Sequence, residues 1–163
     1  KNWRNILRRY KMISKALITF LTSWIIENTE FNKEVSNPSF YSLSEKEMSD
    51  KACFSSSKCR VKAFYVKDQG IFYRNNLLPE ENVCDKSIIL HEMIHHYQKN
   101  SKRKIDLDEK TIWTLQERQA LYYQNLFLIS QKRLNGNRGP ENILECEGGS
   151  YLDLQYKYRE TNQ

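Results

Sequence analysis

The stretch IILHEMIHHYQ, residues 88–98, holds all three histidines of this 163-residue chain. Its apolar residues recur at the three- and four-residue spacing of a helix, so one face of that helix is expected to lie in the core. The helix is expected to pack against a small sheet and a backing helix, which would hold the histidines on rigid backbone. The residues predicted to form this core face are Ile89, Leu90, Met93, Ile94 and Tyr97.

The sequence on either side predicts further elements around this helix. Asp85 is predicted to cap it, so that it runs from about residue 86 to residue 99. Upstream, VKAFYVKDQGIFYRNNL (61–77) contains two strand-like runs around KDQG and predicts a β-hairpin. Downstream, a second long helix is expected from about residue 108 to residue 132, where NGNRGP ends it.

The two ends of the chain carry weaker signals. Apolar residues at positions 6, 10, 13, 17, 20, 21 and 24 predict a long amphipathic N-terminal helix. The apolar run within it is too short for a transmembrane segment, and any signal peptide is expected to have been removed before Lys1. Short helices are expected at 43–52, where Ser44 and Glu47 have capping-box spacing, and at 151–160. This order predicts one α+β domain over residues 1–163.

Composition narrows the class of protein. Hydrophobic residues make up 39% and charged residues 28% of the chain, which is typical of a globular domain. The formal net charge of +6 would allow contact with an anionic surface. Aromatic residues do not alternate with the basic runs and no nucleic-acid motif is present, so a solvated basic surface is favoured. We expect a monomer without a nucleic-acid partner.

The four cysteines, Cys53, Cys59, Cys84 and Cys146, include no C-x-x-C pair, which argues against a zinc ribbon or a thioredoxin-type site. Four cysteines allow three pairings. The short loop favours Cys53–Cys59 together with Cys84–Cys146, and free thiols are the alternative. Two disulfides would indicate a secreted or periplasmic protein.

The segment HEMIH is an H-E-x-x-H motif, and on a helix it has the geometry of a zinc site. His91 and His95 lie one turn apart on one face, where both imidazoles can bind one ion. Glu92 can then reach a metal-bound water without becoming a ligand itself. His96 points about 140° away from His91 and is expected to have no metal role.

A catalytic zinc site takes three protein ligands and keeps one position for water. The chain has no further histidine, and the extended H-E-x-x-H-x-x-G-x-x-H pattern fails because Gln98 and Ser101 stand at its glycine and final histidine positions. The third ligand is therefore expected to be a carboxylate, ahead of a tyrosine or a thiolate.

Glu117, in the next long helix, is the favoured third ligand. Ala120 beside it would let the two helices approach closely, and Gln124 on the same stripe could hydrogen-bond a ligand or the partner helix. Asp106 and Asp108 are the reserve candidates, and the alternative for Glu117 is an ordinary solvated helix residue.

This combination resembles the gluzincin branch of the zincin metallopeptidases. The finer pattern, HEMIHHYQ followed by ERQALYYQN, resembles small bacterial zincin-like families with an H-E-x-x-H-x-x-Q helix, which includes Gln98, and an E-x-x-A-x-x-x-Q helix, which includes Gln124. The resemblance covers residues 86–128. It implies a zincin-like fold with an N-terminal backing helix, a small antiparallel sheet or hairpin, the active-site helix and the glutamate helix. It also implies that an edge strand from 61–74 holds an extended peptide.

The function expected from these features is a zinc metallopeptidase, a hydrolase that acts on a protein or peptide substrate. Zn²⁺ would be held by His91, His95 and Glu117, and Glu92 would activate the zinc-bound water as general base. Tyr151 is a candidate oxyanion donor, as are Tyr156 and Tyr158, although packing is the alternative for each. The rival functions are a zinc amidase for cell-wall peptides, a catalytically inactive interaction module, and a basic nucleic-acid binder.

Overall fold

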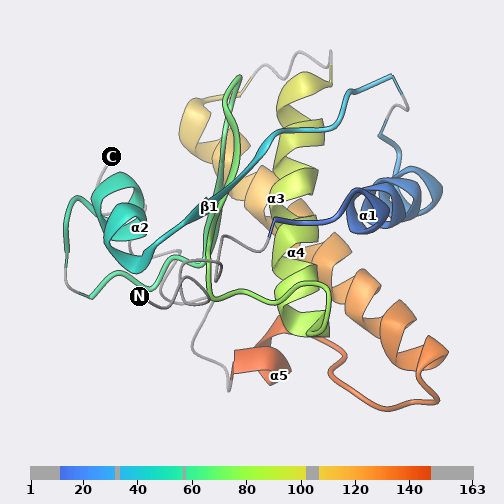
Figure 1. The fold of residues 1–163 in the computed structure, drawn as a ribbon. Coiled ribbons are helices and arrows are strands. Elements are labelled where there is room, and N and C mark those ends of the chain that lie inside the picture. Colours follow the sequence, from blue (N-terminus) through green and yellow to red (C-terminus); the bar gives the residue numbers. More distant parts are fainter. Residues whose placement is uncertain (1–11, 32–33, 57, 102–106, 148–163) are drawn as a thin grey trace, which may run out of the picture.

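The computed structural model describes residues 12–31, 34–56, 58–101 and 107–147 (Figure 1). Over this part, five helices and a three-stranded sheet confirm the predicted α+β class. The elements follow the order α1 (Lys15–Asn28), β1 (Phe40–Leu43), α2 (Glu45–Ala52), β2 (Ala63–Val66), β3 (Gly70–Arg74), α3 (Val83–Asn100), α4 (Glu109–Leu134) and α5 (Ile143–Glu147).

Helix α3 lies in the middle of the molecule, with the sheet on one side and α1 on the other (Figure 1). It packs against β2, β3 and α4. Its predicted core face is confirmed, because Ile89, Leu90, Met93, Ile94 and Tyr97 are all inaccessible to solvent. The helix that carries the three histidines is therefore held on several sides by the core.

The sheet has the strand order β1-β3-β2, and the predicted hairpin is confirmed as the antiparallel pair β2 and β3. The prediction of an antiparallel sheet is wrong for its third member, because β1 pairs with β3 in parallel. Gly70 permits this pairing. It has a φ of +132°, and a Cβ there would lie 2.4 Å from the carbonyl oxygen of Ser39, just before β1.

The two faces of the sheet pack against different partners, following the two-residue alternation of a strand. Ile71 and Tyr73 belong to the main core, together with residues of α1, α3 and α4. Phe72 points the other way and packs with Leu43 and Met48 in a small second cluster beneath α2. The sheet thus lies between α2 and the helix that carries the histidines.

The first residues of α1 and α2 are set by polar residues that cap the backbone. Helix α1 begins at Lys15 because Ser14 accepts the N–H of Leu17, so the predicted helical residue Ile13 lies outside it. Residues 1–11 lie outside the described ranges. The predicted capping box of α2 is confirmed, but the helix begins at Glu45, because residue 43 belongs to β1.

Helix α3 begins three residues earlier than predicted. Asn82 is the N-cap and accepts the N–H groups of Cys84 and Asp85. The predicted cap, Asp85, lies inside the first turn and accepts the N–H of Leu78 instead. The predicted helix at 108–132 is confirmed as α4, with Asp108 as its N-cap.

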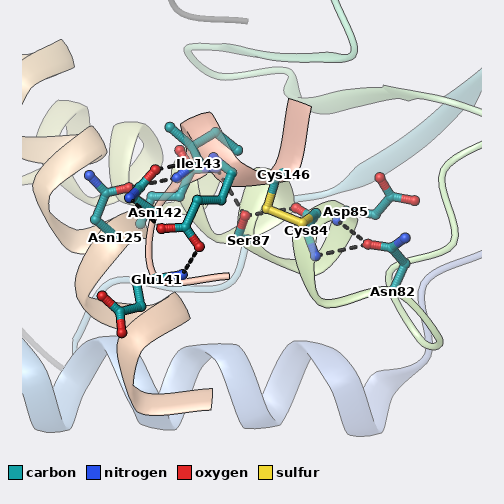
Figure 2. Close-up of a disulfide and its surroundings, with 11 residues drawn as sticks. Asn82, Cys84, Asp85, Ser87, Asn125, Glu141, Asn142, Ile143 and Cys146 are labelled. Atoms are coloured by element: carbon teal, nitrogen blue, oxygen red, sulfur yellow. Dashed lines mark hydrogen bonds between the residues drawn. A yellow bond between two sulfur atoms is a disulfide. The ribbon is translucent and has the colours of Figure 1, made fainter. Parts of the chain in front are cut away.

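Both predicted disulfides are present. Cys53–Cys59 closes the loop after α2, and Cys84–Cys146 joins the first turn of α3 to α5 (Figure 2). Helix α5 was not predicted, and the helix expected at 151–160 lies outside the described residues. Two disulfides are compatible with an oxidising compartment. Within the described ranges, no helix combines the length and the apolar character needed to cross a membrane.

Candidate metal centre

Two helices bring the three predicted ligands together. His91 and His95 lie one turn apart on α3, and Glu117 faces them from α4, against which α3 packs. All three are buried, with 4%, 7% and 5% of their surfaces exposed. One ligand atom from each residue lies within 4.8 Å of the others, so the group could hold a metal ion.

The separations within this group fit one shared ion. The Nε2 atoms of His91 and His95 are 3.1 Å apart. The carboxylate of Glu117 lies 3.1 Å from Nε2 of His95 and 3.5 Å from Nε2 of His91. Ligand atoms about 2.0–2.1 Å from a tetrahedral ion stand roughly 3.3 Å from one another. The three side chains therefore have the spacing of ligands around an ion of that size.

Two glutamines hold the imidazole rings from behind. Nδ1 of His91 lies 3.0 Å from Oε1 of Gln124, and Nδ1 of His95 lies 2.8 Å from Oε1 of Gln98. An amide oxygen only accepts hydrogen bonds, so in each neutral ring Nδ1 carries the proton. The lone pair is then on Nε2, which is the atom directed at the shared centre.

The orientation of both amides is fixed by their own partners. Nε2 of Gln98 donates to the carbonyl oxygen of residue 116 and to Oε1 of Gln119. Nε2 of Gln124 donates to the hydroxyl of Ser87, which itself donates to the carbonyl of Cys84. The sequence did not point to Gln119. A weak signal existed for Ser87, which stands one turn before His91 on the same helix.

Glu92 provides an independent observation at this site. It is 1% exposed, and its Oε2 has no hydrogen-bond partner among the described residues. A buried carboxylate oxygen without a partner is costly, and such exceptions mark functional positions or an ion or water that binds there. Glu92, which follows the ligand His91 in the sequence, is therefore suited to act on a bound water.

The charge state of Glu117 suits a ligand. Burial raises the pKa of its carboxyl group. Hydrogen bonds and charge interactions with His91 and His95, when these rings also carry a proton on Nε2, lower the pKa by a larger amount, so that it lies far below the usual range. The carboxylate is therefore ionised and can bind a cation.

His96 does not join the group, as predicted. Its Nε2 donates to the carbonyl of Ser36 over 2.7 Å, and its ring packs edge-on against Tyr65 of β2. Burial lowers the pKa of this ring, although the hydrogen bond to Ser36 opposes the shift. His96 is therefore a neutral residue of the sheet–helix interface.

The reserve ligands and the oxyanion candidates are not part of the described site. Asp108 caps α4 by accepting from the N–H and the hydroxyl of Thr111, so its carboxylate is already engaged. Asp106 lies outside the described residues, as do Tyr151, Tyr156 and Tyr158.

A family model described as "Domain of unknown function (DUF6647)" matches residues 11–132, which is most of the chain. The chain belongs to this family. The part that matches DUF6647 contains all three residues of the candidate metal centre and both glutamines, but it ends before α5 and Cys146. Neither the curated proteins nor the solved structures include a significant match.

Proposed function

We propose that this DUF6647 protein is a zinc-dependent metallopeptidase. The observation that supports this most strongly is the buried group of His91, His95 and Glu117, next to a buried Glu92 whose Oε2 has no partner among the described residues. Two imidazoles and one carboxylate, with a fourth position left for water, are the ligand set of catalytic zinc sites of the His₂Glu type.

Zinc bound to these ligands would supply a water of pKa about 7 and would polarise the scissile carbonyl. Glu92 accepts a proton from the attacking water as the water oxygen bonds to the carbonyl carbon. Glu92 then gives this proton to the leaving nitrogen as the C–N bond breaks. Gln98 and Gln124 keep the two imidazoles in the required tautomer throughout.

The sheet offers a place for a peptide. Among the described strands, β2 pairs with β3 on one side only, so it is an edge strand. Its residue Tyr65 contacts His96 and Asn100 of α3, which places β2 alongside the helix that carries the metal ligands. The resemblance to gluzincins implies that an extended substrate adds to this edge by main-chain hydrogen bonds.

The two disulfides support action in a secreted or periplasmic setting. A peptidase in either setting would meet unfolded protein or cell-wall peptides. The amides of a cell-wall peptide are the alternative substrate, because the same chemistry hydrolyses both.

The first experiment combines metal analysis with hydrolysis. The purified chain should hold one zinc ion, and the double variant His91→Ala with His95→Ala should hold none. Glu92→Gln should keep the zinc ion but lose hydrolysis of unfolded protein by at least about 100-fold, because it cannot accept a proton. Lys67→Gln, an exposed change in the turn after β2, is the control.

Two results would contradict the proposal. Full activity of the zinc-loaded Glu92→Gln variant would exclude Glu92 as the general base. Stoichiometric zinc without hydrolysis of protein, peptide or cell-wall substrates would instead favour an inactive interaction module.

A further inference from the structure

A second polar site lies between the segment that leads into β2 and the first turn of α3. It is a cavity of about 430 Å³. Its charged lining consists of three cations, Arg60, Lys62 and Arg74, and one carboxylate, Asp85. The excess of positive charge in a concave site favours an anionic ligand.

Arg74 is held in place for such a role. Its Nε donates to the carbonyl of Val61 over 2.7 Å, and its Nη2 donates to the carbonyl of Cys59. Neutral carbonyls orient the guanidinium without cancelling its charge. Nη1 is 4.0 Å from the exposed carboxylate of Glu45, a distance and exposure at which an ion pair is weak. The Cys53–Cys59 disulfide fixes the end of the loop that supplies one of these carbonyls.

Lys62 and Asp85 bring charges of opposite sign to the cavity. Burial lowers the pKa of the half-buried ammonium of Lys62. Asp85 raises that pKa but adds a negative charge to the cavity. The substrate proposed above is a peptide, and the anionic group that a peptide carries is a carboxylate.

The cavity is aligned with Glu92. Asp85 precedes Glu92 by seven residues, which is two helical turns, so the two lie on one face about 10 Å apart along the axis. Strand β2 follows the same face, because Lys62 lines the cavity with Asp85 while Tyr65 contacts His96. About three residues of an extended peptide, at roughly 3.3 Å each, cover this distance.

We infer that the cavity binds a carboxylate of the substrate, located about three residues from the peptide bond that is hydrolysed. This specificity rests on the proposed peptidase function. The carboxylate belongs either to an aspartate or glutamate side chain or to the C-terminus of the substrate, and peptides that carry only one of these distinguish the two sources.

Binding is tested on the full metal-free chain by fluorescence polarisation with labelled peptides of alanine and serine. One peptide carries a glutamate, a second carries glutamine at that position, and each is made with a free and with an amidated C-terminus. The carboxylate forms should bind about tenfold more tightly, the effect of one charge-assisted hydrogen bond. Lys62→Met and Arg60→Gln should each remove this preference.

Lys67→Gln is the matched control, because it removes an exposed cation at the opposite end of β2. Arg60 is itself exposed, so Arg60→Gln keeps the test informative if Lys62→Met fails to fold. Equal binding of acidic and neutral peptides, or an equal loss with Lys67→Gln, would overturn the inference.

Hydrolysis by the zinc-loaded protein separates this inference from the proposed function. As the glutamate is moved along the peptide, the cleaved bond should move with it, at a spacing of about three residues. Cleavage that ignores the glutamate and is unchanged in Lys62→Met would overturn the carboxylate site while supporting the peptidase. Carboxylate-dependent binding without any hydrolysis would support the site and overturn the peptidase.

Discussion

At the residue scale, the character of the metal centre depends on how the far side of each imidazole is held. Gln98 and Gln124 bind the Nδ1 atoms of His95 and His91, so the opposite nitrogens converge with the carboxylate of Glu117. Partners of this kind orient ligands and contribute to metal affinity although they never touch the ion.

We therefore expect Gln124→Leu to weaken zinc binding by about 10- to 100-fold, because the ring of His91 loses its hydrogen bond and its fixed tautomer. Zinc affinity is measured by competition with a chromophoric chelator. Gln131→Leu, farther along α4, is the control, because Nε2 of Gln131 donates over 3.5 Å to its neighbour Ser130 and not to a metal ligand. Unchanged affinity in Gln124→Leu would show that Gln124 does not support the ligand.

The sequence predicted this group of residues because helical spacing determines which side chains share a face. His91 and His95 follow from a four-residue step, and Glu117 and Gln124 follow from one stripe on α4. Ser87 and Gln119 were not predicted, because the partner of a buried amide depends on how two helices pack. The spacing of residues within one helix does not show how that helix packs against the other.

At the element scale, the start of α3 shows two polar residues, Asn82 and Asp85, that could each cap the same helix. Asn82 accepts two N–H groups of the first turn, whereas Asp85 accepts one from the preceding loop. Both residue types are favoured at N-caps, so composition alone did not separate them.

Asn82→Ala should lower the free energy of unfolding by about 1 kcal/mol, because two N–H groups of α3 lose their acceptor. Denaturant titration followed by circular dichroism measures this. Asn82→Asp keeps the acceptor and should retain most of the stability. A loss in Asn82→Asp as large as that in Asn82→Ala would show that capping is not the cause.

The cap of α4 predicts a dependence on pH. Hydrogen bonds from the side chain and the backbone of Thr111 lower the pKa of Asp108. Because the folded pKa lies below the unfolded value of about 3.9, the stabilisation is complete above that pH and is lost as pH falls through the folded pKa.

The excess stability of the wild type over Asp108→Asn should therefore be constant near neutral pH and should shrink below about pH 4. Thermal unfolding of both proteins across this range tests the expectation. A difference that grows in acid would contradict the assigned direction of the pKa shift.

The long helices and the hairpin were predictable because their signals are local. Strand β1 was not, since it has four residues and pairs with β3 about thirty positions later in the chain. Helix α5 has five residues and is held by contacts with other elements. These are its disulfide to α3 and the hydrogen bond that the N–H of Ile143 donates to the side chain of Asn125 (Figure 2). Short elements of this kind exist only because their partners do.

At the scale of the whole molecule, the two disulfides constrain the chain over different lengths. Cys84–Cys146 spans 62 positions and connects α3 to a helix beyond the part that matches the family. Cys53–Cys59 spans six and constrains one loop. In the chain-entropy description, the longer loop gives the larger stabilisation.

Replacing Cys84 and Cys146 together by serine should lower the free energy of unfolding by about 4 kcal/mol, compared with about 2 kcal/mol for the Cys53 and Cys59 pair. Denaturant titrations of both double variants and the wild type give this comparison. A larger loss from the short loop would indicate that local packing, and not chain entropy, dominates.

The uncharged partners of the two imidazoles also have a consequence for reactivity. A carboxylate in place of Gln98 or Gln124 would push electron density through the ring and make a bound ion a weaker Lewis acid. Because Gln98 and Gln124 are uncharged amides, only Glu117 among the three ligands offsets the double charge of the cation. The ion would stay strongly electrophilic yet dissociate more readily, so a strong chelator should strip this centre sooner than one backed by acidic residues.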